Sequence, residues 1–443
     1  MDRVIRRVVN VIDDAAQDIL NMSVDEARAH LLSEQPDALL EVRGSFALAA
    51  REDETVLMAR SLDRPMRYFL AKEPEGPMLV IAERIDDIGR ILEQHGYRDQ
   101  FHPTYTRMVP AHHVTALRLV GCPDPQPAQR RFFAPPRASA LPDLDAVGLA
   151  YIDALHDEIM LWLASQAEES PLGVLFSGGI DSGAVLLCLY QVLLETGRSP
   201  GRLKAFTLAV DGGGRDAEQA KTFLHQLDLG LLLEVIDVES DDLDPLEAVA
   251  VTEDYKPLDI ECATVGLALL RGIRQRYPDW RLLLDGDGGD ENLKDYPIEE
   301  NGELTIRSVV SNSMLYQEGW GVDAIKHSAT YSGGLSRGCV RTYAPAQRFG
   351  FSGLSPFTRP SLIRIAEGIP FDALTAGSTE KLYALKGELV RRGMRARYGV
   401  DFPVFEKRRF QHGALDARAF SRRFSASVDE YRAHWLSLHV AHT

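Results

Sequence analysis

The first 35 residues combine apolar positions at helical spacing with a polar remainder. The apolar positions that recur in this way are Val4, Val8, Ile12 and Ile19. This spacing predicts helix up to about residue 35. Near the end of the segment, Ser23 and Glu26 have the spacing of a capping box, which predicts the start of a second short helix.

A different pattern begins at Leu39. Short runs rich in apolar and β-branched residues are separated by charged residues or by turns that contain Gly and Pro. These runs are GSFALAAR, TVLMAR, RYFLA, PMLVIA and HHVTALRLV. Short runs with turn residues between them predict an antiparallel sheet.

A proline-rich segment follows the last of these runs. Residues 122–145 hold many prolines and no apolar period, which is typical of an interdomain linker. We therefore expect a first domain over residues 1–125, a linker over 126–145 and a second domain over 146–443. A chain of 443 residues is long enough for two or three domains.

The second domain alternates helical segments with apolar runs. An amphipathic helix is predicted from Val147 to Ala167, and the runs GVLF, KAFTLAV, LLLEVIDV and RLLLDG come after it. Continuous apolar runs that alternate with helices are typical of a parallel sheet covered by helices. The sequence thus predicts an α/β fold for this domain.

A glycine-rich segment, LFSGGIDSG, spans Leu175 to Gly183 between the first run and the next helix. Glycines let the backbone approach a phosphate without a Cβ clash, and the N–H groups at a helix start point at the anion. The residues expected to hold the phosphates are Leu175, Ser177, Gly178, Gly179 and Ser182. Asp181 lies among them, and a carboxylate beside a polyphosphate implies a divalent cation between the two. A plain strand-to-helix turn is the alternative interpretation.

A second segment, LLLDGDGGDENLKDY, spans Leu282 to Tyr296 and is acidic. A strand that ends in a Gly-rich turn places the carboxylates of that turn at the carboxyl edge of a parallel sheet, where such sheets bind ligands. The closely spaced carboxylates repel one another, so a dication or a shared proton is expected among them. A solvated acidic turn or a calcium loop is the alternative, although the spacing is not that of an EF-hand.

Both segments resemble a known family. Ser-Gly-Gly-x-Asp-Ser at a strand-to-helix junction resembles the pyrophosphate loop shared by asparagine synthetases, GMP synthetases and tRNA-thiolating enzymes, and it lacks the Gly-Lys-Ser/Thr end of a Walker A motif. The acidic segment resembles LSGEGADELFGGY of asparagine synthetases. That match places Asp290 at the family's metal-ligand aspartate, Asp287 at its acidic position and Gly286 in the ATP site.

Two more segments carry the same resemblance. AFTLAV looks like the strand that lies beside the adenine in asparagine synthetases, so Thr207, Leu208 and Ala209 are candidates for adenine contact or else plain core residues. FEKRRFQHGALD matches the family's K-x-x-F-x-x-G pattern, with Lys407 as the lysine. In asparagine and β-lactam synthetases this lysine neutralises charge on the α-phosphate and on the transition state. Alone, it would suggest only a solvated basic turn.

In asparagine synthetases, the stretch that ends in EARVPFLD helps to form the acceptor side of the pocket, and the corresponding stretch of this chain departs from the family pattern. Pro356 and Phe357 match the PF of its EARVPFLD motif, but Ser352 replaces the glutamate and Arg359 replaces the aspartate. The resemblance therefore does not establish aspartate as the substrate. The candidates for lining the substrate pocket are Tyr296, Tyr331 and Tyr343.

The amino-terminal segment resembles the second half of a class II glutaminase domain. The matching residues, in order, are Arg43, Gly44, Phe46, Ala59, Arg60, Asp63, Arg64 and Glu83. Such a glutaminase uses an amino-terminal cysteine as its nucleophile. Here position 2 is Asp2, and no cysteine precedes Cys122. We expect no glutamine hydrolysis by this domain, which leaves free ammonia, a separate glutaminase subunit or an amine on the substrate as the nitrogen source.

Composition narrows the possible partners and surroundings. A net charge of −16 and a pI near 5.3 argue against nucleic-acid binding, because such a surface repels phosphate backbones. The four cysteines lie far apart, with no CxxC pair, so neither a zinc site nor a disulfide framework is indicated. No signal peptide or membrane-spanning stretch is evident, and a reducing cytoplasm fits best.

The resemblance implies a parallel-sheet synthetase domain of the adenine-nucleotide α-hydrolase-like (PP-loop) fold, preceded by a smaller α+β domain of Ntn-hydrolase-like type. It implies an ATP- and Mg²⁺-dependent ligase that adenylates a small-molecule carboxylate and transfers the acyl group to an amine or ammonia. Asp181 and Asp290 would bind the metal, Lys407 would neutralise transition-state charge, and Asp287 would meet the amine. A homodimer is also expected.

Several alternatives stay open at this point. The chain could be the synthetase subunit of a two-component amidotransferase or an intramolecular cyclase similar to β-lactam synthetases. A thiolation enzyme would need a persulfide cysteine or a basic tRNA-binding face, and the scattered cysteines and acidic charge argue against both. A non-catalytic scaffold is the alternative from outside the enzyme class.

Overall fold

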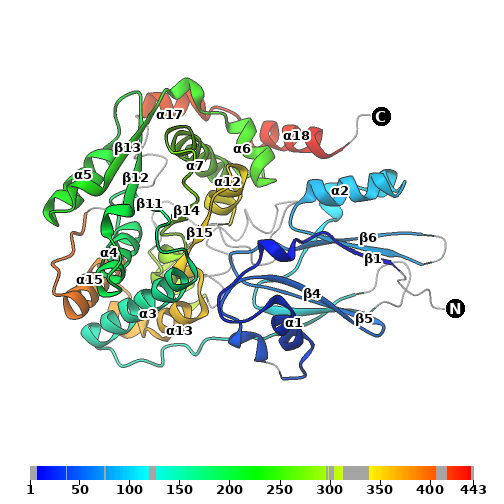
Figure 1. Ribbon diagram of the computed structural model, residues 1–443, viewed down its shortest axis with the longest axis horizontal. Helices are drawn as coiled ribbons and strands as arrows, with labels where there is room; N and C mark the ends of the chain where they lie inside the picture. The colour runs from blue at the N-terminus through cyan, green and yellow to red at the C-terminus, as the bar shows by residue number, and fades with distance from the viewer. Residues whose placement is uncertain are drawn as a thin grey trace.

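The computed structural model describes residues 7–35, 37–73, 76–118, 126–295, 298, 304–312, 339–405 and 417–440. Figure 1 shows two halves side by side, an amino-terminal half with β4, β5 and β6 and a second half built around β11 to β15. Within these described residues no helix is both long and apolar enough to cross a membrane.

The amino-terminal half is a sandwich of two four-stranded sheets. The first has the order β1 (Arg7–Asn10), β7 (Met78–Ala82), β6 (Arg67–Ala71), β8 (Arg107–Met108). The second has the order β10 (Ala128–Arg131), β9 (His113–Arg118), β5 (Thr55–Arg60), β4 (Ala47–Glu52). All pairs are antiparallel except β1 with β7. A two-stranded ribbon joins β2 (Asp18–Ile19) to β3 (Gly44–Ser45).

The sandwich has an apolar interior and a helix on each outer face. Met58 of β5, Tyr68 of β6 and Leu79 of β7 share the buried cluster between the sheets. The helix α1 (Val24–Leu32) packs on the second sheet and α2 (Ile85–Gln94) on the first. The strand pairing confirms the predicted antiparallel sheet. Successive side chains of a strand pack alternately against the other sheet and against the outer helix, as Leu79 and Val80 of β7 do.

The predicted helix over the first 35 residues is wrong for its described part up to Ile19. Val8 lies in strand β1, paired in parallel with Leu79 of β7, and Ile19 lies in β2. A spacing of four residues also places side chains on one face of a strand, so the apolar period did not separate the two structures. The predicted capping box is confirmed: Glu26 accepts from Ser23 N–H at 2.8 Å, and Ser23 Oγ accepts from Glu26 N–H at 3.3 Å.

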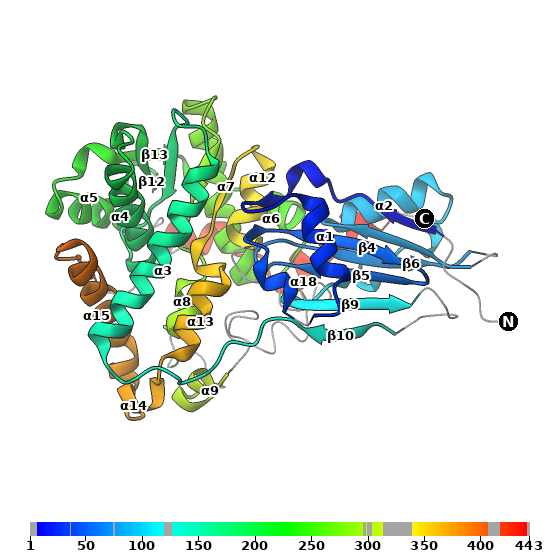
Figure 2. The same cartoon turned by 60° about the horizontal axis from the view of Figure 1, so that its bottom comes forward.

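Strand β10 lies inside residues 126–145, the segment predicted as a linker, and pairs with β9. The sandwich therefore extends to Arg131. The following residues run as an extended connection to α3 (Figure 2), held where Ala138 and Ala140 donate backbone hydrogen bonds to Glu367 and Gly368.

The second half contains a five-stranded sheet in which every pair is parallel. Its order is β13 (Leu233–Val238), β12 (Leu203–Val210), β11 (Leu172–Leu175), β14 (Leu282–Leu284), β15 (Ser352–Leu354). The predicted parallel sheet is confirmed, together with its first four strands. Strand β15 was not predicted, because its residues, Ser-Gly-Leu, carry no apolar run.

Helices cover both faces of this sheet. On one face lie α3 (Leu144–Ser165), α4 (Ile180–Glu195), α5 (Arg215–Gln226) and α15 (Thr379–Tyr398), and on the other lies α7 (Pro257–Arg276). Neighbouring residues of β12 show the alternation, since Ala205 is buried with the first group and Phe206 with α7. The strand order reverses between β11 and β14, which is where open α/β sheets bind their ligands.

The remaining helices connect the halves or extend the second one. They are α6 (Pro245–Thr252), α8 (Gly289–Leu293), α9 (Ile306–Ser311), the π-helical turn η9 (Cys339–Tyr343), α12 (Ala344–Arg348), η10 (Pro356–Thr358), α13 (Pro360–Gly368), α14 (Phe371–Thr375), α17 (Ala417–Arg423) and α18 (Val428–His439). Ile88 of α2 shares a buried cluster with residues of α6, α7 and α18. Glu253, after α6, accepts from Ile85 N–H and Asp86 N–H at 2.9 and 3.0 Å and so caps α2 across the domain interface.

Candidate functional site

The glycine-rich loop lies between β11 and α4, as its sequence predicts. Gly178 has a φ of +74°, and a Cβ there would lie 2.7 Å from the backbone N of Ala220. Both the left-handed backbone and the close approach of α5 therefore require glycine. The Gln219 side chain of α5 also fixes the loop backbone, because it donates a hydrogen bond to the Gly178 carbonyl oxygen at 3.1 Å.

Hydroxyl groups of this loop lie at the amino terminus of α4. Ser182 Oγ accepts from Ser177 N–H at 3.3 Å, and Ser177 Oγ accepts from Gly179 N–H at 3.3 Å. The two hydroxyls are themselves 3.3 Å apart. The loop thus presents serine hydroxyls at the positive end of a 16-residue helix, the arrangement that suits a phosphate.

The acidic loop after β14 packs directly against this phosphate loop. A Cβ at Gly286 would lie 2.7 Å from the backbone N of Ser182, and one at Gly289 would lie 2.2 Å from Asp181 Oδ1. Larger side chains at either position would push the loops apart. The glycines therefore bring Asp290 and Asp181, which lie far apart in the sequence, to one place.

A lysine that we did not predict joins the two aspartates. Lys386 Nζ, from α15, is 2.5 Å from Asp181 Oδ2, 2.5 Å from Asp290 Oδ1 and 3.6 Å from Asp295 Oδ2. Burial alone lowers the pKa of this lysine, but the three carboxylates, Asp181 first, raise the pKa well above its ordinary value. The charged form of Lys386 is therefore favoured, and its ammonium group contacts both predicted metal ligands.

The sequence held one signal for Lys386. It lies on the buried side of α15, among Leu382, Leu385 and Leu389, at a position where helical spacing predicts an apolar residue. A lysine is rarely buried unless it is paired, so a lysine on the apolar face of a helix indicates a carboxylate or phosphate partner.

Asp181 and Asp290 fit a Mg²⁺ ion that is shared with a bound nucleotide. Both carboxylates contact the same ammonium group, so both are close enough to share one cation, and their side chains remain 20% and 38% exposed. Mg²⁺ is commonly held by one or two carboxylates together with substrate phosphates. Within the described ranges, no group of three or more His, Cys, Asp or Glu residues is placed to bind a metal.

A second pair of carboxylates, Asp285 and Asp287, belongs to the same acidic loop. Asp285 is buried and accepts from Asp287 N–H at 2.9 Å and from Ser355 Oγ at 2.8 Å. Burial, and then the neighbouring charge of Asp287, raises the pKa of Asp285 well above its ordinary value. Burial also raises the pKa of Asp287, against the effect of a hydrogen bond donated by Thr342 Oγ1. This pair can hold a proton at a pH where ordinary carboxylates are ionised.

The predicted site residues Thr207, Leu208 and Tyr343 lie in two separate places. Thr207 and Leu208 are buried in β12, and the Leu208 side chain packs in the cluster that contains α7 residues. The Tyr343 hydroxyl donates to Glu83 of the amino-terminal sandwich at 3.3 Å. Lys407, Tyr296 and Tyr331 lie outside the described residues.

The two departures on the acceptor side also differ from each other. Ser352 is exposed in β15, whereas Arg359 is 3% exposed. Arg359 donates to the Gly44 carbonyl oxygen at 2.6 Å and lies 3.3 Å from Asp63, so it joins the two halves of the molecule.

Comparison with known families matches residues 164–322 to asparagine synthase. Residues 164–322 are thus similar in sequence to an asparagine synthase domain. The match begins in α3 and includes the phosphate loop, the acidic loop and strands β11 to β14. The resemblance to asparagine synthetases is thereby confirmed over this range, and the match supports an ATP-dependent amide ligase of the asparagine synthetase type. Comparison with curated proteins gives no match.

The fold of the asparagine synthase domain continues beyond the matched residues. Strand β15 completes its sheet, and α15 packs on its helices α3 and α4. Lys386 thus lies outside the matched range but contacts Asp181 and Asp290 inside it.

Proposed function

We propose that this chain uses ATP to adenylate a small-molecule carboxylate and then transfers the acyl group to an amine or ammonia. A carboxylate oxygen would attack the α-phosphorus, and the bond from that phosphorus to the bridging oxygen would break to release pyrophosphate. The amine nitrogen would then attack the acyl carbon, lose a proton and displace AMP.

The phosphate side of the site supplies positioning and charge. The loop from Ser177 to Ser182 would bind the departing pyrophosphate, with Lys386 as a fixed cation beside it. Mg²⁺, held by Asp181 and Asp290, would neutralise phosphate charge and orient the leaving group. Lys407 stays a prediction for the charge on the α-phosphate.

The acceptor side offers Asp287 for the incoming amine. Thr342 orients this carboxylate, and Asp285 accepts from its backbone N–H. The raised pKa of Asp287 suits a group that takes a proton from an ammonium that becomes an amide. The nitrogen would come from free ammonia, from an amine on the substrate, as in a cyclase, or from a separate glutaminase subunit.

One observation carries this proposal. Two loops pack together through their glycines where the strand order reverses, and Asp181 and Asp290 of these loops both contact the buried Lys386 of α15. The test is pyrophosphate release from ATP and Mg²⁺ across a panel of small carboxylates. Asp290→Asn should abolish the release that a carboxylate induces, and Asp279→Asn, at an exposed aspartate, should preserve it. ATP binding without turnover on any carboxylate would indicate a non-catalytic scaffold instead.

A further inference from the structure

The π-helical turn η9 contacts both halves of the molecule through two consecutive residues. Thr342 Oγ1 donates to Asp287 Oδ2 in the acidic loop. The hydroxyl of the next residue, Tyr343, donates to Glu83 Oε2 in the amino-terminal sandwich at 3.3 Å. Because the two residues are adjacent, any displacement of Tyr343 also displaces the backbone that carries Thr342.

Glu83 is itself held firmly within the sandwich. It accepts from Arg64 Nε at 2.7 Å, and Arg64 is only 3% exposed. The Arg64 guanidinium lies 5.7 Å from the centre of the Tyr343 ring, and it also donates to the Ala16 carbonyl oxygen. Tyr343 thus contacts a charged pair, of which Arg64 is buried and Glu83 is half-buried, and makes a cation–π contact with Arg64 at the domain interface.

A second set of contacts brings the sandwich close to the same loop. Asp63, which precedes Arg64, lies 3.3 Å from Arg359, and Arg359 follows η10 near the end of β15. Ser355, between β15 and η10, donates to Asp285. By contrast, the carboxylates that the structure describes around Lys386 all come from the part of the molecule built around the parallel sheet. Residues of the acceptor side therefore contact the amino-terminal sandwich directly, at Tyr343 and at Arg359.

We propose that the amino-terminal domain positions the acceptor side of the site, with Glu83 holding Tyr343 and thereby holding Thr342 against Asp287. This inference rests on the proposed function. Glu83 and Tyr343 are positioning residues in this scheme, because they act through Thr342. A domain that resembles a glutaminase would thus serve amide formation through its position rather than through glutamine hydrolysis.

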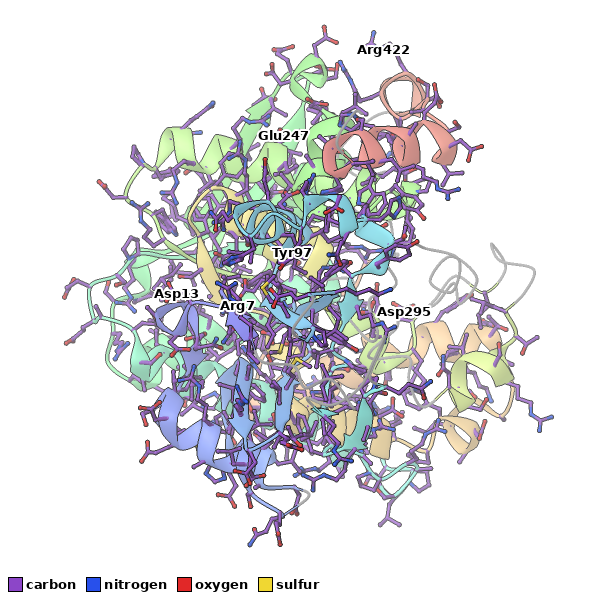
Figure 3. All side chains as sticks on the ribbon, turned by 90° about the vertical axis from the view of Figure 1, so that its right-hand side faces the viewer. Arg7, Asp13, Tyr97, Glu247, Asp295 and Arg422 are labelled. Atoms are coloured by element: carbon purple, nitrogen blue, oxygen red, sulfur yellow. The ribbon has the colours of Figure 1, made fainter. Side chains whose placement is uncertain are left out.

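The first test is independent of substrate. Hydrogen–deuterium exchange of the peptide that contains residues 285–290 should be about tenfold faster in Glu83→Gln than in the unaltered protein, which corresponds to about 1.4 kcal/mol of local opening. Glu247→Gln is the matched control, because Glu247 also pairs with an arginine and is 24% exposed, compared with 23% for Glu83. Figure 3 shows Glu247 well separated from Asp295, which contacts Lys386. Equal exchange of the peptide in both variants would overturn the proposal.

The second test separates the two half-reactions. With a carboxylate that supports exchange of pyrophosphate into ATP, and with hydroxylamine as the amine, Glu83→Gln should raise the KM for hydroxylamine about tenfold. The rate of pyrophosphate exchange should stay within about twofold. If the rate of pyrophosphate exchange fell by the same factor as the KM for hydroxylamine rose, a role in positioning the acceptor side would be contradicted. Tyr343→Phe removes one hydroxyl and should give the same direction if Glu83→Gln does not fold.

The two tests can fail separately. If no carboxylate supports pyrophosphate exchange, the proposed function fails, and the deuterium exchange of residues 285–290 still decides whether Glu83 positions the acidic loop. If pyrophosphate exchange occurs but the loop and the hydroxylamine KM do not respond to Glu83→Gln, only the positioning role fails.

Discussion

The phosphate side and the acceptor side share one edge of the parallel sheet but are built differently. The phosphate side combines a continuous loop, Ser177 to Ser182, which contains Asp181, with Asp290 of the acidic loop and Lys386 of α15. The acceptor side joins Asp285 and Asp287 to Ser355, Thr342 and, through Tyr343, the amino-terminal sandwich. In the proposed function, the chemistry on ATP thus depends on two adjacent loops and Lys386, whereas the acceptor side also depends on contacts with the amino-terminal sandwich.

This contrast agrees with where the chain keeps or departs from the family pattern. Residues 164–322, which match asparagine synthase, contain both loops of the phosphate side. The departures, Ser352 and Arg359, both follow that range, and Arg359 is directed into the domain interface. The matched range thus contains Asp285 and Asp287 as well as Asp181 and Asp290, and both departures from the family pattern lie outside it.

The largest effect is expected from a substitution of Lys386, which tests the role of the phosphate side most severely. Lys386→Met leaves three carboxylates beside the phosphates without their cation. We expect the rate of pyrophosphate release to fall by about 100- to 1,000-fold. Lys381→Met, at an exposed lysine of the same helix, should change the rate less than about twofold. Full activity in Lys386→Met would remove this lysine from the site.

A smaller effect is expected from the fit between α5 and the phosphate loop. Gly178→Ala should weaken ATP binding by at least about tenfold, because the new methyl group meets the backbone of Ala220. Gly197→Ala is the control: Gly197 has a similar positive φ of +69°, but a Cβ there meets nothing within 4 Å. Both variants should lose about 1 kcal/mol of stability from backbone strain. Equal ATP affinity by titration calorimetry would show that the close contact does not shape the loop.

The smallest effect concerns Asp285 on the acceptor side and is a change in how the free energy of unfolding depends on pH. Asp285 has a raised pKa in the folded chain, so the folded state binds more protons than the unfolded state above the ordinary value of 3.8. The free energy of unfolding therefore falls as pH rises from that value to the raised pKa, with a slope of up to about 1.4 kcal/mol per pH unit. Asp285→Asn removes this term and should be the more stable protein at pH 8, with the difference shrinking toward pH 4.

Denaturant unfolding at several pH values measures this difference. The exposed Asp279→Asn serves as the control and should follow the unaltered protein across the whole range. If the difference in unfolding free energy between Asp285→Asn and the unaltered protein were the same at every pH, Asp285 would not have a raised pKa.

The sequence predicted the elements whose pattern is local. The strands β11 to β14 are runs of apolar residues, and the phosphate loop is a contiguous motif, so both were predicted at the right places. The first strand was mistaken for helix because Val8 and Ile12 fit either period, and only the pairing of Val8 with Leu79 decides between them. Strand β15 is too short and too polar to carry a pattern.

The sequence predicted only those site residues that stand in local motifs. Asp181 and Asp290 stand in motifs, whereas the contact of Lys386 with both depends on how α15 packs against α3 and α4. The contact of Tyr343 with Glu83 joins residues 260 positions apart, and no local pattern encodes such a pair. The phosphate side therefore has more local sequence signals than the acceptor side.

The central claim is that a carboxylate oxygen attacks the α-phosphorus of ATP at this site. Incubation with ATP, Mg²⁺ and a carboxylate labelled with ¹⁸O measures this directly, with mass spectrometry of the nucleotide product after amide formation. The account predicts that one labelled oxygen appears in the phosphate of AMP. Formation of ADP, with the label in inorganic phosphate, would contradict it.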